Sequence, residues 1–141
     1  FAEFRNAQVF RDTAKPVHNM ISMAKHVING QTESCKTILL TARSDFDDRD
    51  TFLQTFRDHN FPIDLVHVER AANLAGRYKS TPNVSKLAVI RKYISTGRYN
   101  KVRVWDDSEK NLQTIVKLVH FHPEIEVEAW LVKHDGTTER Y

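Results

Sequence analysis

The chain has 141 residues, 40% of them hydrophobic, which is enough for one sizeable core in a single domain spanning residues 1–141. No apolar run approaches the roughly 20 residues that cross a bilayer, so a membrane-spanning helix is excluded and we expect no membrane partner. The 21 Lys and Arg residues exceed the 18 Asp and Glu residues by three, which permits phosphate-bearing partners without demanding them.

The cysteine count shows whether the chain can form an internal disulfide. Cys35 is the only cysteine, so the sequence has no internal disulfide framework. A chain of this kind suits a reducing compartment, and we therefore expect a cytoplasmic location.

The amino-terminal part favours two helices. The stretch up to Thr13 carries a partly apolar face. From Pro16 to Ile28, apolar residues recur at helical spacing, and Gly30 supplies a stop. The first residue is Phe1 rather than Met, and we expect an upstream segment to precede it.

Two strands with a helix between them are predicted next. Lys36–Thr41 carries three consecutive large aliphatic residues, which is typical of a strand buried on both faces. Phe52 and Phe56 then line one face of a helix whose first turn holds Asp47 and Asp48. Ile63–Val68, after a Phe-Pro turn, is predicted as a second short strand.

A long polar connection follows from Glu69 to Ser85. It carries Arg70, Arg77 and Lys79, and loops of this length are either functional or simply solvated surface. If these cations act together, they form a basic module that binds nucleic acid.

The next helix places a lysine near its start. Thr81 or Ser85 is a candidate cap, and apolar residues repeat at helical spacing until Gly97. Lys86 then falls in the first turn, where a cation opposes the helix macrodipole. A charged ligand is one explanation for its presence, and chance placement is the other.

Val102–Trp105 is predicted to be a strand, and it runs directly into two adjacent carboxylates, Asp106 and Asp107. Paired carboxylates repel each other, and a hard divalent cation such as Mg²⁺ makes such a pair tolerable. Ligands of open parallel sheets bind just beyond the carboxyl ends of the strands. The competing interpretation is that Asp107 or Ser108 merely caps the following helix.

The carboxyl-terminal part completes an α/β pattern. A helix containing Leu112–Val119 ends near Pro123, Ile125–Val132 alternates apolar and charged residues, and Asp135-Gly136 is a strong hairpin signal. Strands alternating with helices predict a mainly parallel sheet with flanking helices and an antiparallel hairpin at the end.

Three polar elements occur in a characteristic order: Thr41 after a hydrophobic strand, Lys86 at a helix start, and Asp106-Asp107 after another strand. Together they resemble the second, third and fourth motifs of the haloacid dehalogenase superfamily. The runs at residues 39–43 and 105–111 look particularly like those of small phage-encoded members. The resemblance covers most of the chain and implies a doubly wound, Rossmann-like α/β fold.

The resemblance also implies a Mg²⁺-dependent phosphatase that acts through an aspartyl-phosphate on a phosphorylated substrate. Thr41 and Lys86 would each contact a phosphoryl oxygen as catalytic groups. Asp106 would be the leading metal ligand and Asp107 a direct or water-mediated second. Arg43 would reach a substrate phosphate, although a surface salt bridge is the commoner fate of such an arginine.

One motif of the family is missing. An Asp-x-Asp-x-Thr/Val motif after a hydrophobic strand, which supplies the nucleophile, does not occur, so we expect this chain alone to be inactive. The strand that carries it lies at the sheet centre, between the strands ending in Thr41 and Asp106. We therefore expect a carboxyl-terminal portion of a longer protein, with an upstream segment or a second chain completing the sheet.

The short stretch before Thr41 leaves no room for a large cap domain there, so an open site is expected. An open site suits a nucleotide or a nucleic-acid end as substrate. Two alternatives remain: a non-catalytic interaction or regulatory domain on the same scaffold, and the basic nucleic-acid-binding module.

Overall fold

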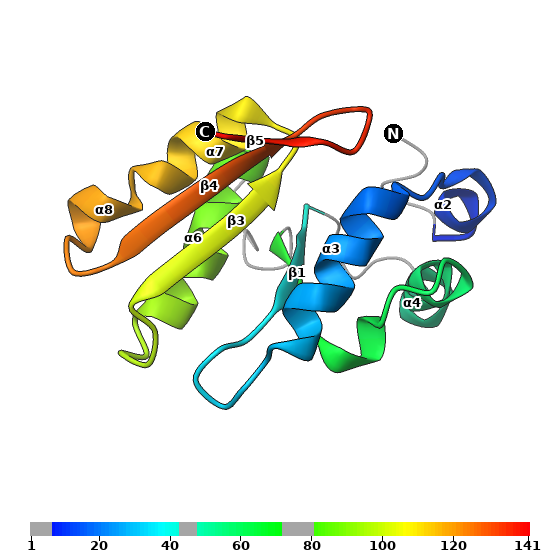
Figure 1. Ribbon diagram of the computed structural model, residues 1–141, viewed down its shortest axis with the longest axis horizontal. Coiled ribbons are helices and arrows are strands. Elements are labelled where there is room, and N and C mark those ends of the chain that lie inside the picture. Colours follow the sequence, from blue (N-terminus) through cyan, green and yellow to red (C-terminus); the bar gives the residue numbers. More distant parts are fainter. Residues whose placement is uncertain (1–6, 43–47, 72–80) are drawn as a thin grey trace. The chain divides into compact units, whose positions relative to one another are not determined.

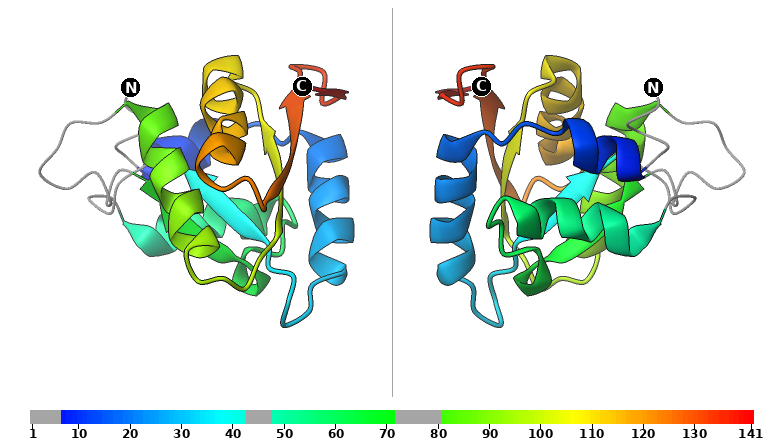
Figure 2. Two further views of the ribbon diagram at one scale, coloured as in Figure 1. Left: turned by 90° about the vertical axis from the view of Figure 1, so that its left-hand side faces the viewer. Right: turned by 90° about the vertical axis from the view of Figure 1, so that its right-hand side faces the viewer.

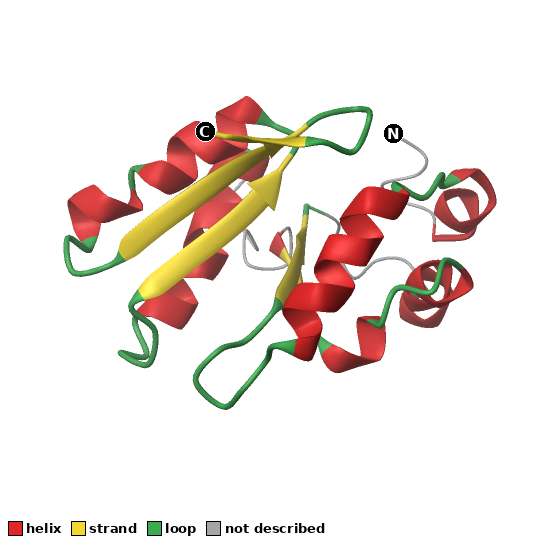
Figure 3. Cartoon of the chain, viewed as in Figure 1, coloured by secondary structure: helices red, strands yellow, loops and turns green. Residues whose placement is uncertain are grey.

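The computed structural model describes residues 7–42, 48–71 and 81–141. The chain divides into two compact units, residues 1–73 and 74–141, and each is described by itself. Both units mix helices with short strands (Figure 3), so the predicted α/β class is confirmed. That residues 1–141 form one domain stays a prediction.

The first unit carries the two predicted amino-terminal helices and the strand that ends in Thr41. Its elements in chain order are α2 (Ala7–Thr13), α3 (His18–Asn29), β1 (Ile38–Thr41), α4 (Arg49–Asp58), the 3-10 helix η1 (Ile63–Leu65) and β2 (His67–Arg70) (Figure 1). Gly30 takes the C-cap position of α3, as its place after the apolar repeat predicts.

Helix α4 begins at a carboxylate cap. The Asp48 side chain accepts hydrogen bonds from the backbone N–H groups of Asp50 and Thr51, at 3.0 and 3.2 Å. These bonds satisfy two of the N–H groups that a helix start leaves without partners. Asp47, expected in the same turn, lies outside the described residues.

Four phenylalanines connect α2, α4 and the turn after α4. The ring centroids of Phe10, Phe52, Phe56 and Phe61 lie 5.3–6.0 Å apart in successive pairs. Phe52 is buried, and Phe56 contacts each of the other three rings. Aromatic pairs at these separations add to the free energy gained from burying their area, so this group anchors α4 against α2.

The second strand begins later than predicted. Residues 63–65 form η1, and β2 starts only at His67. The backbone N–H of Leu65 donates to the Pro62 carbonyl at 3.1 Å, so the chain turns tightly after proline instead of extending. An apolar run behind a proline can bury its side chains from a 3-10 turn as well as from a strand, which is why the prediction of a strand from Ile63 was wrong.

The second unit places its helices on one face of a sheet. Its elements are α6 (Pro82–Ile94), β3 (Lys101–Asp106), α7 (Glu109–Val116), α8 (Leu118–Phe121), β4 (Glu126–Val132) and β5 (Thr138–Arg140). Figures 1 and 2 show α6, α7 and α8 on the same side of β3 and β4. The core between them contains Ile94, Leu118 and Ile125, with Val102 and Val127 packed against it.

Strand pairing in each unit follows the predicted directions. β1 pairs with β2 in parallel, and β3 pairs with β4 in parallel. β5 runs antiparallel to β4 after a turn in which Gly136 has φ 83°, a left-handed conformation that favours glycine. The hairpin predicted from Asp135-Gly136 is therefore confirmed.

The strands form two small sheets, one parallel and one mixed. Within the described ranges, β1 and β3 belong to different sheets, so they are not hydrogen-bonded neighbours. No helix in the described part of the chain is long and apolar enough to span a membrane.

Candidate functional site

Asp106 is the last residue of β3, and its carboxylate lies on the helix-covered face of the sheet. Side chains alternate between the two faces of a strand, and Val102, four residues earlier, packs against the core beneath the helices. The Asp106 side chain is only 7% exposed. A carboxylate removed from water in this way requires hydrogen-bond donors or a counter-charge.

Three residues supply those donors. Asp106 Oδ1 accepts from the Ser108 backbone N–H at 2.9 Å and from Asn111 Nδ2 at 3.3 Å. Asp106 Oδ2 accepts from Lys86 Nζ at 2.8 Å and from Asn111 Nδ2 at 3.2 Å. Each carboxylate oxygen thus has two donor contacts, which matches the number of its lone pairs.

Lys86 supplies the positive charge of this cluster. Its side chain is 14% exposed, so the ion pair with Asp106 is largely screened from solvent. An ammonium group has three N–H donors, and the Asp106 bond uses one of them. Among the described residues, the remaining two donors have no protein partner that would compete with a ligand oxygen.

The position of Lys86 along α6 differs from the predicted one. Thr81 takes the N-cap position without a side-chain cap bond, and Pro82 is the first helical residue. Lys86 is therefore the fifth residue of α6 and not in its first turn, which weakens the argument from the macrodipole. The presence of a lysine at this position is explained by its ion pair with Asp106, twenty residues further along the chain.

A second polar contact links the two helices that flank the cluster. Asn83 Nδ2 on α6 donates to Thr114 Oγ1 on α7 at 2.8 Å. Lys86 and Asn111, three residues away from this pair on their respective helices, meet at Asp106. These contacts tie α6 and α7 to each other and tie both helices to the end of β3.

Ser108, not Asp107, caps α7. The Ser108 hydroxyl accepts a hydrogen bond from the Asn111 backbone N–H at 3.2 Å. The capping interpretation is thus confirmed for Ser108, and it leaves both carboxylates for other roles. Asp107 is exposed beside the ion pair.

Thr41 ends β1, as predicted, and is partly buried there. It belongs to the first unit, whereas Lys86 and Asp106 belong to the second. The convergence of Lys86 with Asp106 is therefore observed, and that of Thr41 with this pair stays a prediction. Arg43, the expected substrate-binding residue, lies outside the described residues.

Asp106 and Asp107 offer the hard oxygen ligands that Mg²⁺ prefers. Mg²⁺ typically takes one or two carboxylates together with waters and substrate phosphates, and this adjacent pair fits that requirement. In the described part of the chain no group of three or more His, Cys, Asp or Glu side chains gathers as a metal site. A cation bound to Asp106 would have to replace one of its present donor contacts.

Of the three basic residues of the nucleic-acid alternative, Arg70 lies in the described structure. Arg70 is the last residue of β2, only 5% exposed, with its guanidinium 4.8 Å from the Phe52 ring centroid. The prediction that it belongs to a solvated loop was therefore wrong. Arg77 and Lys79 lie outside the described residues.

Asn111 and the Ser108 backbone N–H are the parts of the cluster that sequence reasoning missed. The sequence did contain a signal for Ser108, because a serine two residues after the strand-ending Asp106 is a typical cap for the next helix. An asparagine at the third position of a helix is too common to be singled out by that signal alone.

Comparison of the chain with protein-family models, with curated proteins and with solved structures gives no match.

Proposed function

We propose that this chain carries the lysine and metal-binding part of a Mg²⁺-dependent phosphatase site of the haloacid dehalogenase type. The observation that supports it most is the 2.8 Å ion pair between Lys86 Nζ and Asp106 Oδ2 at the carboxyl end of a parallel strand. Lysine and aspartate from separate elements meet where open α/β sheets bind their ligands. A phosphoric monoester is the substrate class that this combination fits.

Each residue has a defined task in this proposal. Lys86 contacts a phosphoryl oxygen through its two remaining N–H donors, and the Thr41 hydroxyl contacts another. Arg43 binds a further substrate phosphate oxygen. Asp106 and Asp107 would hold Mg²⁺, which when bound would neutralise charge on the phosphoryl group.

The attacking aspartate, whose phosphorylation would form the aspartyl-phosphate, is not assigned to a residue of this chain. The open edge of β3 supports the completion of the sheet by another strand. The Glu126 N–H donates to the Asn100 carbonyl at 2.9 Å, so even-numbered residues direct their backbone groups toward β4. Those of Lys101, Arg103 and Trp105 then face the other edge, where no described strand pairs with them.

That edge fits the full fold of this proposal, a doubly wound sheet whose first central strand comes from an upstream segment or a second chain. Unpaired backbone groups on a strand with half-buried neighbours are costly, which favours such a partner. A nucleotide or nucleic-acid end is the proposed substrate class.

A non-catalytic interaction or regulatory domain is the second candidate, and one observation favours it. The four donor contacts already satisfy the Asp106 carboxylate without a metal ion. A cluster of this kind can hold β3, α6 and α7 together as a purely structural unit.

Calorimetric titration of the chain with Mg²⁺, and then with inorganic phosphate in the presence of Mg²⁺, separates the two candidates. The phosphatase proposal expects both to bind, with Mg²⁺ binding lost in Asp106→Asn and weakened in Asp107→Asn. Glu109→Gln, which removes an exposed carboxylate close by, is the matched control and should bind as wild type. Equal Mg²⁺ affinity in wild type and Asp106→Asn would contradict the proposed metal site.

The same phosphate titration followed by NMR tests whether Thr41 and Lys86 respond to the same ligand. Resonances of both Thr41 and Lys86 should shift together as phosphate binds. A shift of Lys86 alone would remove Thr41 from the proposed site and leave the metal ligands untouched.

A further inference from the structure

Asn111 is buried at the start of α7, with 8% of its surface exposed. Its backbone N–H donates to the Ser108 hydroxyl, and its side-chain Nδ2 donates to both oxygens of Asp106 at 3.3 and 3.2 Å. One residue thus closes the helix cap and touches the carboxylate that meets Lys86. None of the roles proposed above uses this side chain.

The contact geometry shows what the amide does to the carboxylate. The Ser108 N–H meets only Oδ1 and Lys86 Nζ meets only Oδ2, so each holds one end of the group. The Asn111 amide spans both oxygens, and a donor shared in this way resists rotation of the carboxylate about its Cβ–Cγ bond. With that rotation restrained, Oδ2 stays directed at Lys86.

We propose that Asn111 is a positioning residue that orients the Asp106 carboxylate and, through it, the Lys86 ammonium. The catalytic part of this inference rests on the proposed function. In that function, an oriented Lys86 ammonium keeps its two other N–H groups available for a phosphoryl oxygen. Hydrogen-bonding partners of metal-ligating carboxylates act in the same way on ligand orientation.

The amide is chemically distinct from the carboxylate of similar shape. An aspartate at position 111 could not donate, and it would place a second negative charge against Asp106. An amide orients Asp106 without adding charge, so the cluster of Asp106, Asp107 and Lys86 keeps a formal charge of −1, from two carboxylates and one ammonium.

The test compares Asn111→Ala and Asn111→Asp with Thr114→Ala as the matched control. Thr114 lies one turn further along α7 and makes its own bond to α6 through Asn83, but it does not touch Asp106. The first readout is the ¹H–¹⁵N signal of the Lys86 ammonium, which a merely structural residue would leave in place in a folded protein. The second is calorimetric Mg²⁺ affinity.

Both Asn111 variants should shift or broaden the Lys86 ammonium signal, and Asn111→Ala should weaken Mg²⁺ binding by about 10–100-fold, the range typical of lost outer-shell contacts. Thr114→Ala should leave both readouts as in wild type. If Asn111→Ala does not fold, the nearly isosteric Asn111→Asp carries the comparison. In the wild-type protein, the Asn111 side-chain amide signals should shift together with Lys86 as Mg²⁺ is added.

An unchanged Lys86 signal in the folded Asn111 variants would overturn the positioning role. The positioning role would also be overturned if adding Mg²⁺ shifted the Lys86 signal but left the Asn111 side-chain amide signals unchanged. A wild-type protein that binds no Mg²⁺, combined with loss of the Lys86 signal in the variants, would refute the proposed function and still support the positioning of Lys86 by Asn111.

Discussion

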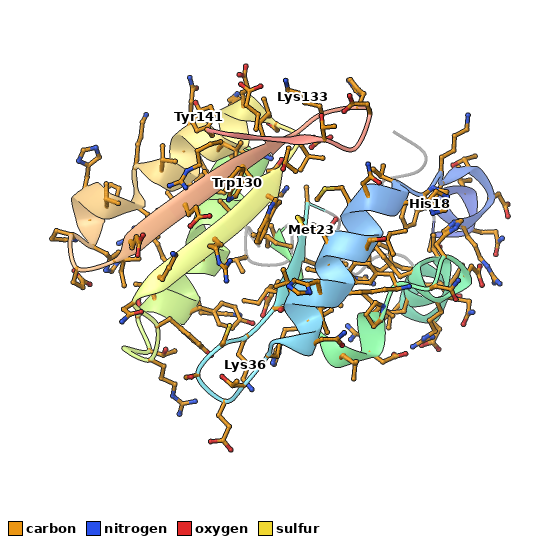
Figure 4. All side chains as sticks on the ribbon, viewed as in Figure 1. His18, Met23, Lys36, Trp130, Lys133 and Tyr141 are labelled. Atoms are coloured by element: carbon orange, nitrogen blue, oxygen red, sulfur yellow. The ribbon has the colours of Figure 1, made fainter. Side chains whose placement is uncertain are left out.

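The ion pair at the end of β3 and the ion pair on the β4–β5 hairpin have similar lengths but different surroundings. Lys86 and Asp106 lie 2.8 Å apart with side chains 14% and 7% exposed, whereas Lys133 and Glu139 lie 2.6 Å apart with side chains 49% and 59% exposed. Lys133 is labelled near the hairpin in Figure 4. The shorter contact is the more solvated one, so distance alone does not rank these pairs.

Burial decides what each pair contributes. Water and salt screen the hairpin charges, and holding two long side chains in one geometry costs entropy. The charges at the end of β3 have already lost most of their water, so removing either partner leaves the other without its counter-charge. We therefore expect substitutions of Lys86 and Asp106 to lower the free energy of unfolding strongly and by unequal amounts. Substitutions in the hairpin pair should change it very little.

The largest effect is expected for Lys86→Met. It leaves the short, rigid Asp106 side chain buried without a counter-charge, and we expect the free energy of unfolding to fall by about 3–5 kcal/mol, measured by urea denaturation. Asp106→Asn should cost less, because the long Lys86 side chain can turn its ammonium toward water.

A double-mutant cycle with Lys86→Met and Asp106→Asn isolates the pair itself. The two changes should be non-additive by about 0.5–3 kcal/mol, the range found for residues in contact. Additive losses would mean that the two side chains do not depend on each other, and the contrast with the hairpin would then disappear.

Ser108→Ala tests how far the rest of the cluster depends on the helix cap. It removes the hydroxyl that accepts the Asn111 N–H, but it keeps the Ser108 N–H that donates to Asp106. We expect a loss of about 1 kcal/mol in the free energy of unfolding, as for other cap residues, measured by urea denaturation. A loss as large as that of Lys86→Met would show that the cap, and not the ion pair, organises this end of β3.

The order of elements in this unit was predictable because each has a local signal. The apolar run of β3, the cap at Ser108 and the Asp135-Gly136 turn depend on residues within a few positions of each other. Of the two caps predicted for α6, Thr81 is confirmed and Ser85 was wrong. Proline at the first helical position favours the earlier start, and this signal was not used.

The candidate site was predictable only in part. The resemblance implied that Thr41, Lys86 and Asp106 converge, and the 2.8 Å contact shows this for Lys86 and Asp106. The contribution of Asn111 depends on how α7 turns after Ser108, which no spacing rule specifies. Arg70 was predicted to be solvated because it follows the predicted strand Ile63–Val68, but β2 continues for two further residues and Arg70 is buried.

Glu128, on β4 next to the hairpin, should make the stability of the protein depend on pH. A hydrogen bond from the Trp130 indole lowers the pKa of Glu128, and Lys101 and Arg140 lower it further. A lowered folded-state pKa means that the folded protein binds the proton less readily than the unfolded chain does. This contribution to stability is present above the ordinary pKa of about 4.5 and is lost as pH falls through the lower folded-state value.

Urea midpoints measured from pH 7 down to pH 3 should therefore fall less steeply in Glu128→Gln than in wild type. Trp130, labelled on β4 in Figure 4, donates from its indole Nε1 to Glu128 Oε1 at 2.8 Å. Trp130→Phe should flatten the profile in part, because it removes the indole hydrogen bond to Glu128 and leaves the two cations. Glu33→Gln, at an exposed position, is the control, and parallel profiles for it and Glu128→Gln would contradict this assignment.

The smallest effect is expected on the hairpin, where Lys133→Ala should leave the urea midpoint unchanged at physiological salt. The hydrogen bond from Lys133 lowers the pKa of Glu139, yet both side chains are solvated, so the attraction is offset by screening and by the entropy of ordering them. Repeating the measurement at low ionic strength should reveal a small loss, because the Debye length grows about threefold between 0.1 and 0.01 M salt. Lys86→Met should keep its effect at both ionic strengths, since added salt screens a carboxylate that is only 7% exposed far less than a solvated one. If the two substitutions instead respond to salt alike, burial is not what separates these ion pairs, and the case for a specialised role of Lys86 loses its physical basis.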